Sequence, residues 1–262
     1  ALAVITTAKD NANGIYNNKA AVNAAAHVNI FTSGANASAV KTDGESTTVL
    51  NGRNYLTTSG DKAHGIEVYA AASSKGSEEK AAQVKVGGDS TIYTQGAQSH
   101  GVYADMLDAN IALGDDSNVT TKGDGAHGLY AARGVIETGD GLQLSVQGTG
   151  AHAAYADSAD GSIKFQGGAD ISAVDPGSYA VYADNGGKIE GLAADSRFII
   201  HGNMLADNSG SIELDLAANS LFAGKSTVEN SGTIDLTMAD SMWRMTGSSS
   251  LTNFINNTSV VD

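Results

Sequence analysis

The feature that most constrains this chain is a short pattern that recurs along its first two thirds. The pattern is clearest at Ala126–Ala131, which reads Ala-His-Gly-Leu-Tyr-Ala. With the position of the His taken as a marker, copies fall at residues 13, 38, 64, 100, 127, 152 and 179. The intervals between markers are 25, 26, 36, 27, 25 and 27 residues. A period this regular indicates a stacked repeat.

Each repeat contains short runs in which apolar and polar residues alternate, bounded by Gly, Asp, Asn or Ser, as in Leu142–Val146. Such runs predict short β-strands. About 25 residues per repeat, holding two or three strands, predicts an all-β fold, a right-handed parallel β-helix (solenoid) of roughly ten turns. A propeller blade needs about 40–45 residues. Only residues 20–27 suggest a helix, and they lack a polar face.

The composition excludes several classes of partner. The net charge is −14 and no basic patch is present, which argues against nucleic acid and against adsorption to anionic membranes. No apolar run of about 20 residues is long enough to span a bilayer. The absence of Cys excludes disulfides and thiolate metal sites.

Alternation assigns the columns that stacking would create. The position two after the marker is apolar in every copy and is predicted to face the core. The position three after it holds Lys41 and Glu67, which would be costly to bury unpaired, so this column is predicted to face outward. The same column carries an aromatic ladder of Tyr103, Tyr130, Tyr155 and Tyr182. The ladder stabilises the stack, or it is a docking strip, since exposed Tyr is favoured at interfaces.

The marker column holds four consecutive His residues and allows two interpretations. Stacked imidazoles suggest a metal site, but collinear rings cannot surround an ion tetrahedrally. The favoured interpretation is a ladder at a corner of the solenoid, hydrogen-bonded to the backbone of the turns. Protonation would then destabilise the fold below about pH 6.

The longest interval between markers contains a second binding candidate. Its extra residues form a charged segment, and insertions in solenoids become loops on one face. The candidate residues are Lys75, Glu78, Glu79 and Lys80.

An enzyme on this fold would need clustered carboxylates beside a cation. Asp105, Asp157 and Asp184 share one offset from the marker, but it is expected to be a turn, while Arg133 and Arg197 are isolated. No phosphate-binding loop, zinc-protease motif or nucleophile elbow is found. We therefore expect no catalytic residue, no metal site and no cofactor.

The repeated unit, followed by alternating strands and Thr-x-Gly turns, resembles the β-helical passenger domains of Gram-negative autotransporters, the type V secretion family that includes pertactin-like proteins. The run Trp243–Leu251 resembles the start of that family's C-terminal stability segment. On this resemblance, residues 1–240 are passenger repeats and residues 241–262 begin a truncated stability (autochaperone) segment.

The resemblance implies a non-enzymatic virulence factor of the adhesin type, extracellular or on the bacterial surface after outer-membrane translocation. Its partners would be a host cell-surface protein or glycan and its own translocator barrel, with no membrane insertion by this fragment. Two alternatives stay open. One is a released effector that activates a host receptor, as growth-promoting, angiogenic passengers do, and the other is a carbohydrate-active β-helix enzyme.

Overall fold

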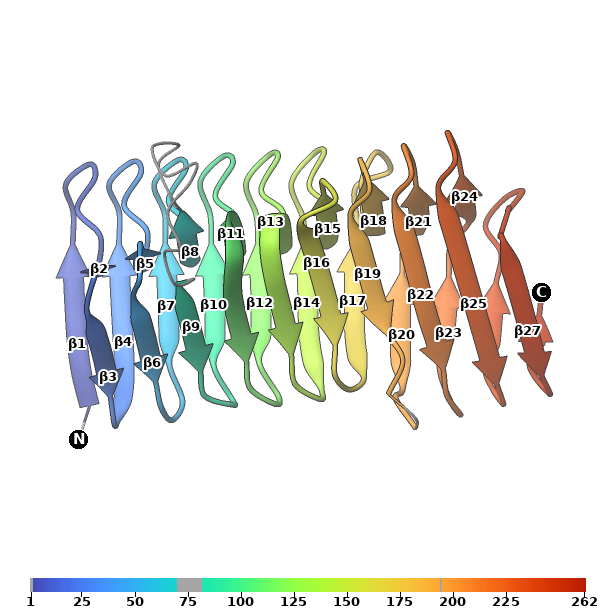
Figure 1. Cartoon of the computed structure of the whole chain (residues 1–262), viewed down its shortest axis with the longest axis horizontal. Coiled ribbons are helices and arrows are strands. Elements are labelled where there is room, and N and C mark those ends of the chain that lie inside the picture. The colour runs from blue at the N-terminus through green and yellow to red at the C-terminus, as the bar shows by residue number, and fades with distance from the viewer. Residues whose placement is uncertain (1, 70–81, 194) are drawn as a thin grey trace.

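The computed structural model describes residues 2–69, 82–193 and 195–262. Within these ranges the regular elements are all β-strands, and neighbouring strands pair in parallel. They wind into a right-handed β-solenoid of about nine turns, with the N-terminus at one end of the rod and the C-terminus at the other (Figure 1). The fold class expected from the repeat is therefore confirmed.

Each turn has three faces, so the strands form three parallel stacks. The first stack consists of β1 (Leu2–Thr7), β4 (His27–Thr32), β7 (Tyr55–Thr58), β10 (Thr91–Thr94), β12 (Asn118–Thr121), β14 (Leu142–Val146), β17 (Ala169–Ala173), β20 (Phe198–His201), β23 (Leu221–Ala223), β26 (Met242–Arg244) and β28 (Val260–Val261). The second consists of β2 (Ile15–Asn18), β5 (Val40–Asp43), β8 (Ile66–Tyr69), the first parts of β11 (Val102–Leu113) and β13 (Leu129–Thr138), β15 (Ala154–Asp157), β18 (Tyr179–Asp184), β21 (Asn203–Ala206) and β24 (Ser226–Val228).

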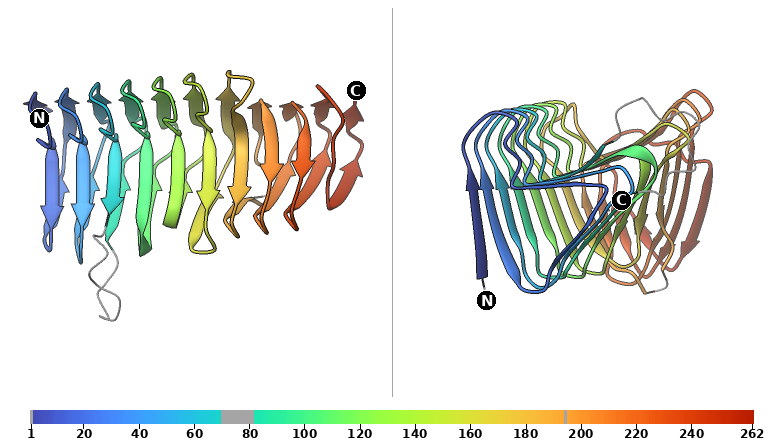
Figure 2. Two further views of the ribbon diagram at one scale, coloured as in Figure 1. Left: turned by 90° about the horizontal axis from the view of Figure 1, so that it is seen from above. Right: turned by 60° about the vertical axis from the view of Figure 1, so that its left-hand side comes forward.

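The third stack consists of β3 (Ala21–Ala24), β6 (Thr47–Leu50), β9 (Gln83–Val86), the second parts of β11 and β13, β16 (Gly161–Phe165), β19 (Lys188–Gly191), β22 (Ser211–Leu216), β25 (Thr233–Ala239) and β27 (Asn253–Asn257). β11 and β13 join the second and third stacks because each continues around the corner between them. Seen obliquely from its N-terminal side, the rod shows turns that follow one another's outline (Figure 2).

The register of the strands confirms the columns read from the sequence. Tyr103 pairs with Tyr130, Tyr130 with Tyr155, and Tyr155 with Tyr182. The column one residue earlier, which includes Leu129, is buried from Val40 to Val181. Identical positions of successive repeats therefore lie directly above one another, as a stacked repeat requires.

Intervals of different length all close into single turns. Ile66 pairs with Val102 across the 36-residue interval, so the extra residues fall between β8 and β9. Ser211 pairs with Thr233, so a turn in the C-terminal part takes only 22 residues. The helix suggested for residues 20–27 is wrong. This segment contains β3 and the first residue of β4, because it turns a corner from one face of the solenoid to the next.

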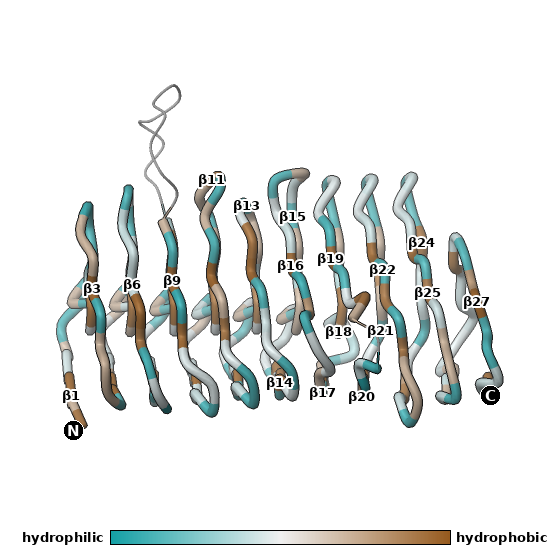
Figure 3. Tube along the Cα trace, turned by 60° about the horizontal axis from the view of Figure 1, so that its bottom comes forward, coloured by the Kyte–Doolittle hydropathy of each residue, from teal (hydrophilic) through white to brown (hydrophobic). Residues whose placement is uncertain are grey.

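The core is a continuous apolar column enclosed by the three stacks, and Figure 3 shows apolar segments recurring in successive turns. Near the C-terminal end it becomes aromatic, where Phe222 stacks on Trp243 with ring centroids 5.1 Å apart. The predicted boundary between residues 240 and 241 lies between β25 and β26, and parallel pairing continues across it.

One column of glycines sets how closely the turns approach. A Cβ on Gly60 would lie 2.0 Å from the carbonyl oxygen of Gly34, and a Cβ on Gly123 would lie 1.8 Å from that of Gly96. Real Cβ atoms do not approach backbone so closely, hence only Gly fits. This column lies at the corner between the first and second stacks, four residues before the markers at 38, 64, 100, 127 and 152.

Candidate functional site

The marker residues project from this corner toward the outside of the rod. The reason is a break in alternation: Gly65 and Ile66 both face inward, because a Cβ on Gly65 would lie 2.3 Å from Ile92 Cγ2 and Ile66 is fully buried. The preceding residue, His64, is thereby turned away from the core and beside the Tyr column. The corner position expected for the His column is confirmed.

The imidazoles form a stack of four rings. Successive centroids from His64 to His100, His127 and His152 are 4.9, 4.9 and 5.0 Å apart, and the ring planes differ by 8°, 1° and 8°. This spacing is close to the separation of neighbouring strands, so the strand stacking itself sets it.

Each ring also caps the backbone of the next turn. His100 N–H donates to His64 Nδ1, His127 N–H to His100 Nδ1 and His152 N–H to His127 Nδ1, each at 3.0 Å, and Tyr179 N–H donates to His152 Nδ1 at 3.1 Å. Because a backbone N–H only donates, Nδ1 must be unprotonated, and the ring proton therefore sits on Nε2. The predicted hydrogen-bonded corner ladder is confirmed.

The ladder continues toward the N-terminus with other acceptors. Ser38 N–H donates to Asn13 Oδ1 at 2.8 Å, and His64 N–H donates to Ser38 Oγ at 3.1 Å. Asn, Ser and His side chains thus accept the same backbone hydrogen bond at one position of the repeat. The capping bond alone does not explain why four consecutive copies carry His.

The surroundings of the imidazoles keep them neutral. Burial, with a smaller contribution from the charge of Lys41, lowers the pKa of His64 from 6.5 to about 3. Burial lowers the pKa of His152 to about 4, and it holds the pKa values of His100 and His127 well below 6.5, with repulsion from neighbouring His residues adding to the effect.

The Tyr column lies beside the His column on the outer surface, but its rings are half-buried rather than freely exposed. Neighbouring rings stack with centroids 5.2 Å apart for Tyr103 and Tyr130, 4.9 Å for Tyr130 and Tyr155, and 4.8 Å for Tyr155 and Tyr182. Their faces are therefore covered by one another, and only edges and hydroxyl groups reach the surface.

Carboxylates accompany this column. Tyr103 Oη donates to Asp105 at 2.9 Å, and Tyr182 Oη donates to Asp184 at 3.1 Å. Burial first, and the neighbouring carboxylate second, raise the pKa values of both phenols above 10. Arg133, expected to be isolated, is paired with Asp105 through Nε at 2.6 Å, because β11 and β13 bring the two residues into register. Asp105, Asp157 and Asp184 all lie in strands, although a turn was expected at this position.

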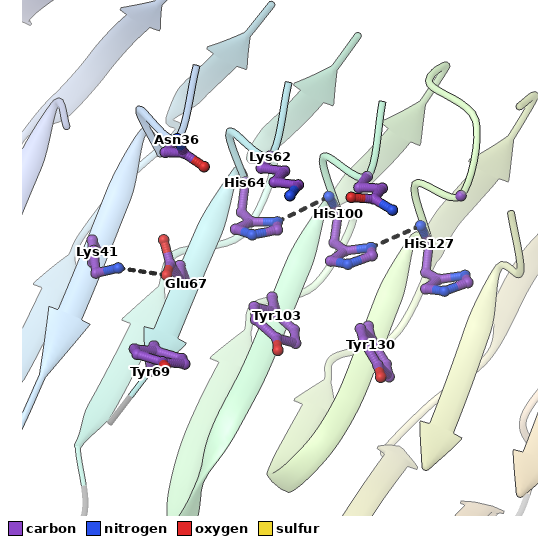
Figure 4. A pocket seen from close by; sticks show the side chains of 12 residues that line it. Asn36, Lys41, Lys62, His64, Glu67, Tyr69, His100, Tyr103, His127 and Tyr130 are labelled. Atoms are coloured by element: carbon purple, nitrogen blue, oxygen red, sulfur yellow. Dashed lines mark hydrogen bonds and ion pairs between the residues drawn. The ribbon is translucent and has the colours of Figure 1, made fainter. Parts of the chain in front are cut away.

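The two columns line a groove of about 700 Å³ (Figure 4). Glu67 lines its N-terminal part, and the Glu67 carboxylate accepts from Lys41 Nζ at 2.6 Å and from Ser38 Oγ at 2.7 Å. Glu67 is only 7% exposed. The Tyr residues and Lys41 of this column lie at the surface as predicted, but Glu67 is buried, because its pairing with Lys41 of the adjacent turn offsets the cost of burying the charge.

The rim of the groove is formed by Asn36, Lys62 and Gln98, which precede the marker by two residues. All three have left-handed backbone, with φ of 52°, 53° and 55°, and Gly125 occupies the same place in the next turn with φ of 62°. Their side chains make no hydrogen bond or ion pair with any described residue. Sequence reasoning overlooked this set, although its constant offset from the marker was visible.

The other predicted binding residues have different outcomes. Tyr103 and Tyr130 line the groove, while Tyr155 and Tyr182 continue the same column beyond it. Lys75, Glu78, Glu79 and Lys80 lie outside the described residues.

Among the described residues, no three His, Asp or Glu side chains converge on a point where they would hold a metal ion. The imidazoles are collinear, and their Nδ1 atoms already accept backbone hydrogen bonds. No described helix is long and apolar enough to cross a membrane. No protein-family model, curated protein or solved structure matches the chain.

Proposed function

We propose that this chain is a non-enzymatic binding rod, the passenger of a Gram-negative autotransporter, which is displayed on or released from the bacterial surface and attaches to host cells. The observation that carries the proposal is the groove beside the His and Tyr columns. It combines aromatic edges with polar side chains that have no partner in the described part of the chain, and such convergent groups on a rigid surface are typical of binding sites.

The arrangement of charged groups favours binding over catalysis. Asp105 is engaged by Arg133 and by the Tyr103 hydroxyl, so this carboxylate is committed to the fold. Among the described residues that line the groove, Glu67 supplies the one carboxylate, and it is paired with Lys41. A general acid–base pair with one group free to exchange a proton is not formed by these residues.

The attribution to autotransporter passengers is supported by the repeat and by the segment that follows Trp243. The Ser run in this segment caps the exposed edge of β24: Ser226 N–H donates to Ser249 Oγ at 3.2 Å, and Val228 N–H donates to Ser250 Oγ at 2.8 Å. A terminal segment that satisfies the last strand edges is what a solenoid needs at its end.

The test measures attachment of the purified chain to cultured host cells and to their isolated membranes. The informative variant is Lys62→Gly with Gln98→Gly, which gives these turns the residue already present at position 125 and removes the rim side chains without backbone strain. The matched control is Lys19→Gly, another exposed Lys with positive φ (58°), outside the groove.

We expect the chain to bind cells, the double variant to bind about tenfold more weakly, and the control to bind normally. Absence of cell binding by the unaltered chain would refute the proposal. Receptor phosphorylation after binding would identify a released effector rather than an adhesin.

A further inference from the structure

The floor of the groove carries a row of hydrogen-bond donors that the fold itself does not use. Because Nδ1 of each ring accepts the next backbone N–H, the proton is on Nε2. Nε2 of His64, His100 and His127 has no partner among the described residues, and none of these atoms is sealed from solvent. The groove therefore presents parallel N–H groups at intervals of 4.9 Å.

This interval discriminates between classes of extended ligand. In a peptide strand, the carbonyl groups on one edge recur every second residue, about 6.8 Å apart, so they drift out of step with the imidazoles after a single rung. A pyranose unit in an extended polysaccharide advances by nearly the length of one rung. Its ring and hydroxyl oxygens can therefore meet successive Nε2–H donors in step.

The charge of the groove selects an uncharged chain. The imidazoles are neutral, and Lys41 is neutralised by Glu67. Lys62 is the one groove cation without an ion pair in the described ranges, whereas the whole chain carries a net charge of −14. A polyanion would meet repulsion along the rod with a single ammonium group to offset it.

The dimensions agree with a short stretch of sugar units. The groove of about 700 Å³ is lined by three successive His rungs and falls within the usual range of ligand sites, about 300–1,000 Å³. It is bordered on one side by the edges of Tyr103 and Tyr130 and on the other by the amides of Asn36 and Gln98, which can donate to and accept from hydroxyl groups.

We propose that this groove binds an uncharged, unbranched polysaccharide along the axis of the rod, one sugar unit per His rung, with Nε2–H of His64, His100 and His127 donating to its oxygens. The inference deepens the binding function proposed above and rests on it. It names the ligand class that the host-cell surface would supply.

The experiment uses the whole chain and an array of neutral hexose and N-acetylhexosamine oligomers of increasing length, with sulfated and carboxylated oligomers beside them. Calorimetry follows for the oligomers that bind. We expect affinity to rise with length up to about three units and then to level off. Nitrogen NMR should show shifts at the Nε2 atoms of the three groove imidazoles and little change at His152.

The matched variants exploit the chain's own replacement for His. His100→Ser with His127→Ser keeps an acceptor for the backbone ladder, as Ser38 does, and removes two Nε2–H donors. His152→Ser makes the same exchange outside the groove. The double variant should bind about tenfold more weakly and the control normally, with thermal unfolding recorded for each.

Several results would overturn the inference: no binding to any neutral oligomer, stronger binding to the anionic oligomers, or equal affinity of a folded double variant. If the chain binds host cells equally well after their neutral glycans are removed enzymatically, the binding function stands and the glycan assignment fails. If the chain binds oligomers but not cells, the glycan assignment stands and the proposed attachment to host cells fails.

Discussion

Acidification should destabilise this rod through its four stacked imidazoles. The pKa values of His64, His100, His127 and His152 are all lowered in the folded state, to about 3 for the first and about 4 for the last. The unfolded chain, with an ordinary His pKa near 6.5, therefore binds more protons. Stability is complete above about pH 7.5 and falls as the pH drops through 6.5 toward the folded-state values.

The magnitude follows from proton linkage. Between pH 7.5 and pH 5.5, an unfolded imidazole goes from about one tenth to about nine tenths protonated while the folded ring stays neutral, which costs about 1.4 kcal/mol per ring. Four rings cost about 5.5 kcal/mol, a large part of the 5–15 kcal/mol that stabilises a typical domain. Carboxylates remain largely ionised over this range, so the window isolates the imidazoles.

Urea unfolding followed by circular dichroism at pH 7.5, 6.5 and 5.5 measures the effect. His100→Ser provides the internal control, because it removes one titrating ring and keeps an acceptor for the backbone. The pH dependence should then decrease by about one quarter. A free energy of unfolding that is the same at pH 7.5 and 5.5 would show that the rings do not cap the backbone as neutral acceptors.

Three further predictions concern packing, a buried hydrogen bond and an ion pair, and two of them include a control substitution. Gly123→Ala places a methyl group against a backbone carbonyl of the preceding turn and should lower the free energy of unfolding by about 3 kcal/mol or more. Gly150→Ala, with open space around it, should lower it by about 1 kcal/mol because of its positive φ. Thermal unfolding compares the two variants. Trp243→Phe removes the Nε1–H donated to a carbonyl at 2.9 Å and should lower the free energy of unfolding in urea by about 1–2 kcal/mol. Glu67→Gln leaves a largely buried ion pair broken and should cost about 2 kcal/mol, while Glu190→Gln, which breaks a more exposed pair, should change stability by less than about 0.5 kcal/mol in the same assay.

The fold could be predicted from the sequence because the same short pattern of strands and turns recurs many times along the chain. A single alternating run such as Leu142–Val146 is ambiguous, but seven markers at nearly constant intervals fix both the register and the columns. The helix suggested near residue 20 was wrong because a short Ala-rich segment has little periodicity of its own. Its conformation is set by pairing with the neighbouring turns.

The site was harder to predict because the His side chains lie at a corner of the solenoid, where the alternation of inward and outward residues breaks. Alternation along the strand would put His64 on the same side as the buried Ile66 two residues later, and only the consecutive inward positions of Gly65 and Ile66 turn His64 outward beside the Tyr column. The pairing of Arg133 with Asp105 could not be predicted from sequence offsets, because the register between β11 and β13 shifts at Asp105. The rim residues Lys62 and Gln98 were missed because they share an offset and a backbone conformation but no chemistry.

The interchangeable rungs have an evolutionary consequence. From Ser38 to Tyr179, each marker N–H donates to an acceptor in the turn before it, whether that acceptor is Asn, Ser or His, so none of these turns requires one particular neighbour. Recombination between two copies, for example one that joins His127 to Ala153 and removes a whole repeat, leaves each remaining cap and each core column in register. We therefore expect a chain shortened or lengthened by one whole repeat to keep its fold, with a His row that is one rung shorter or longer.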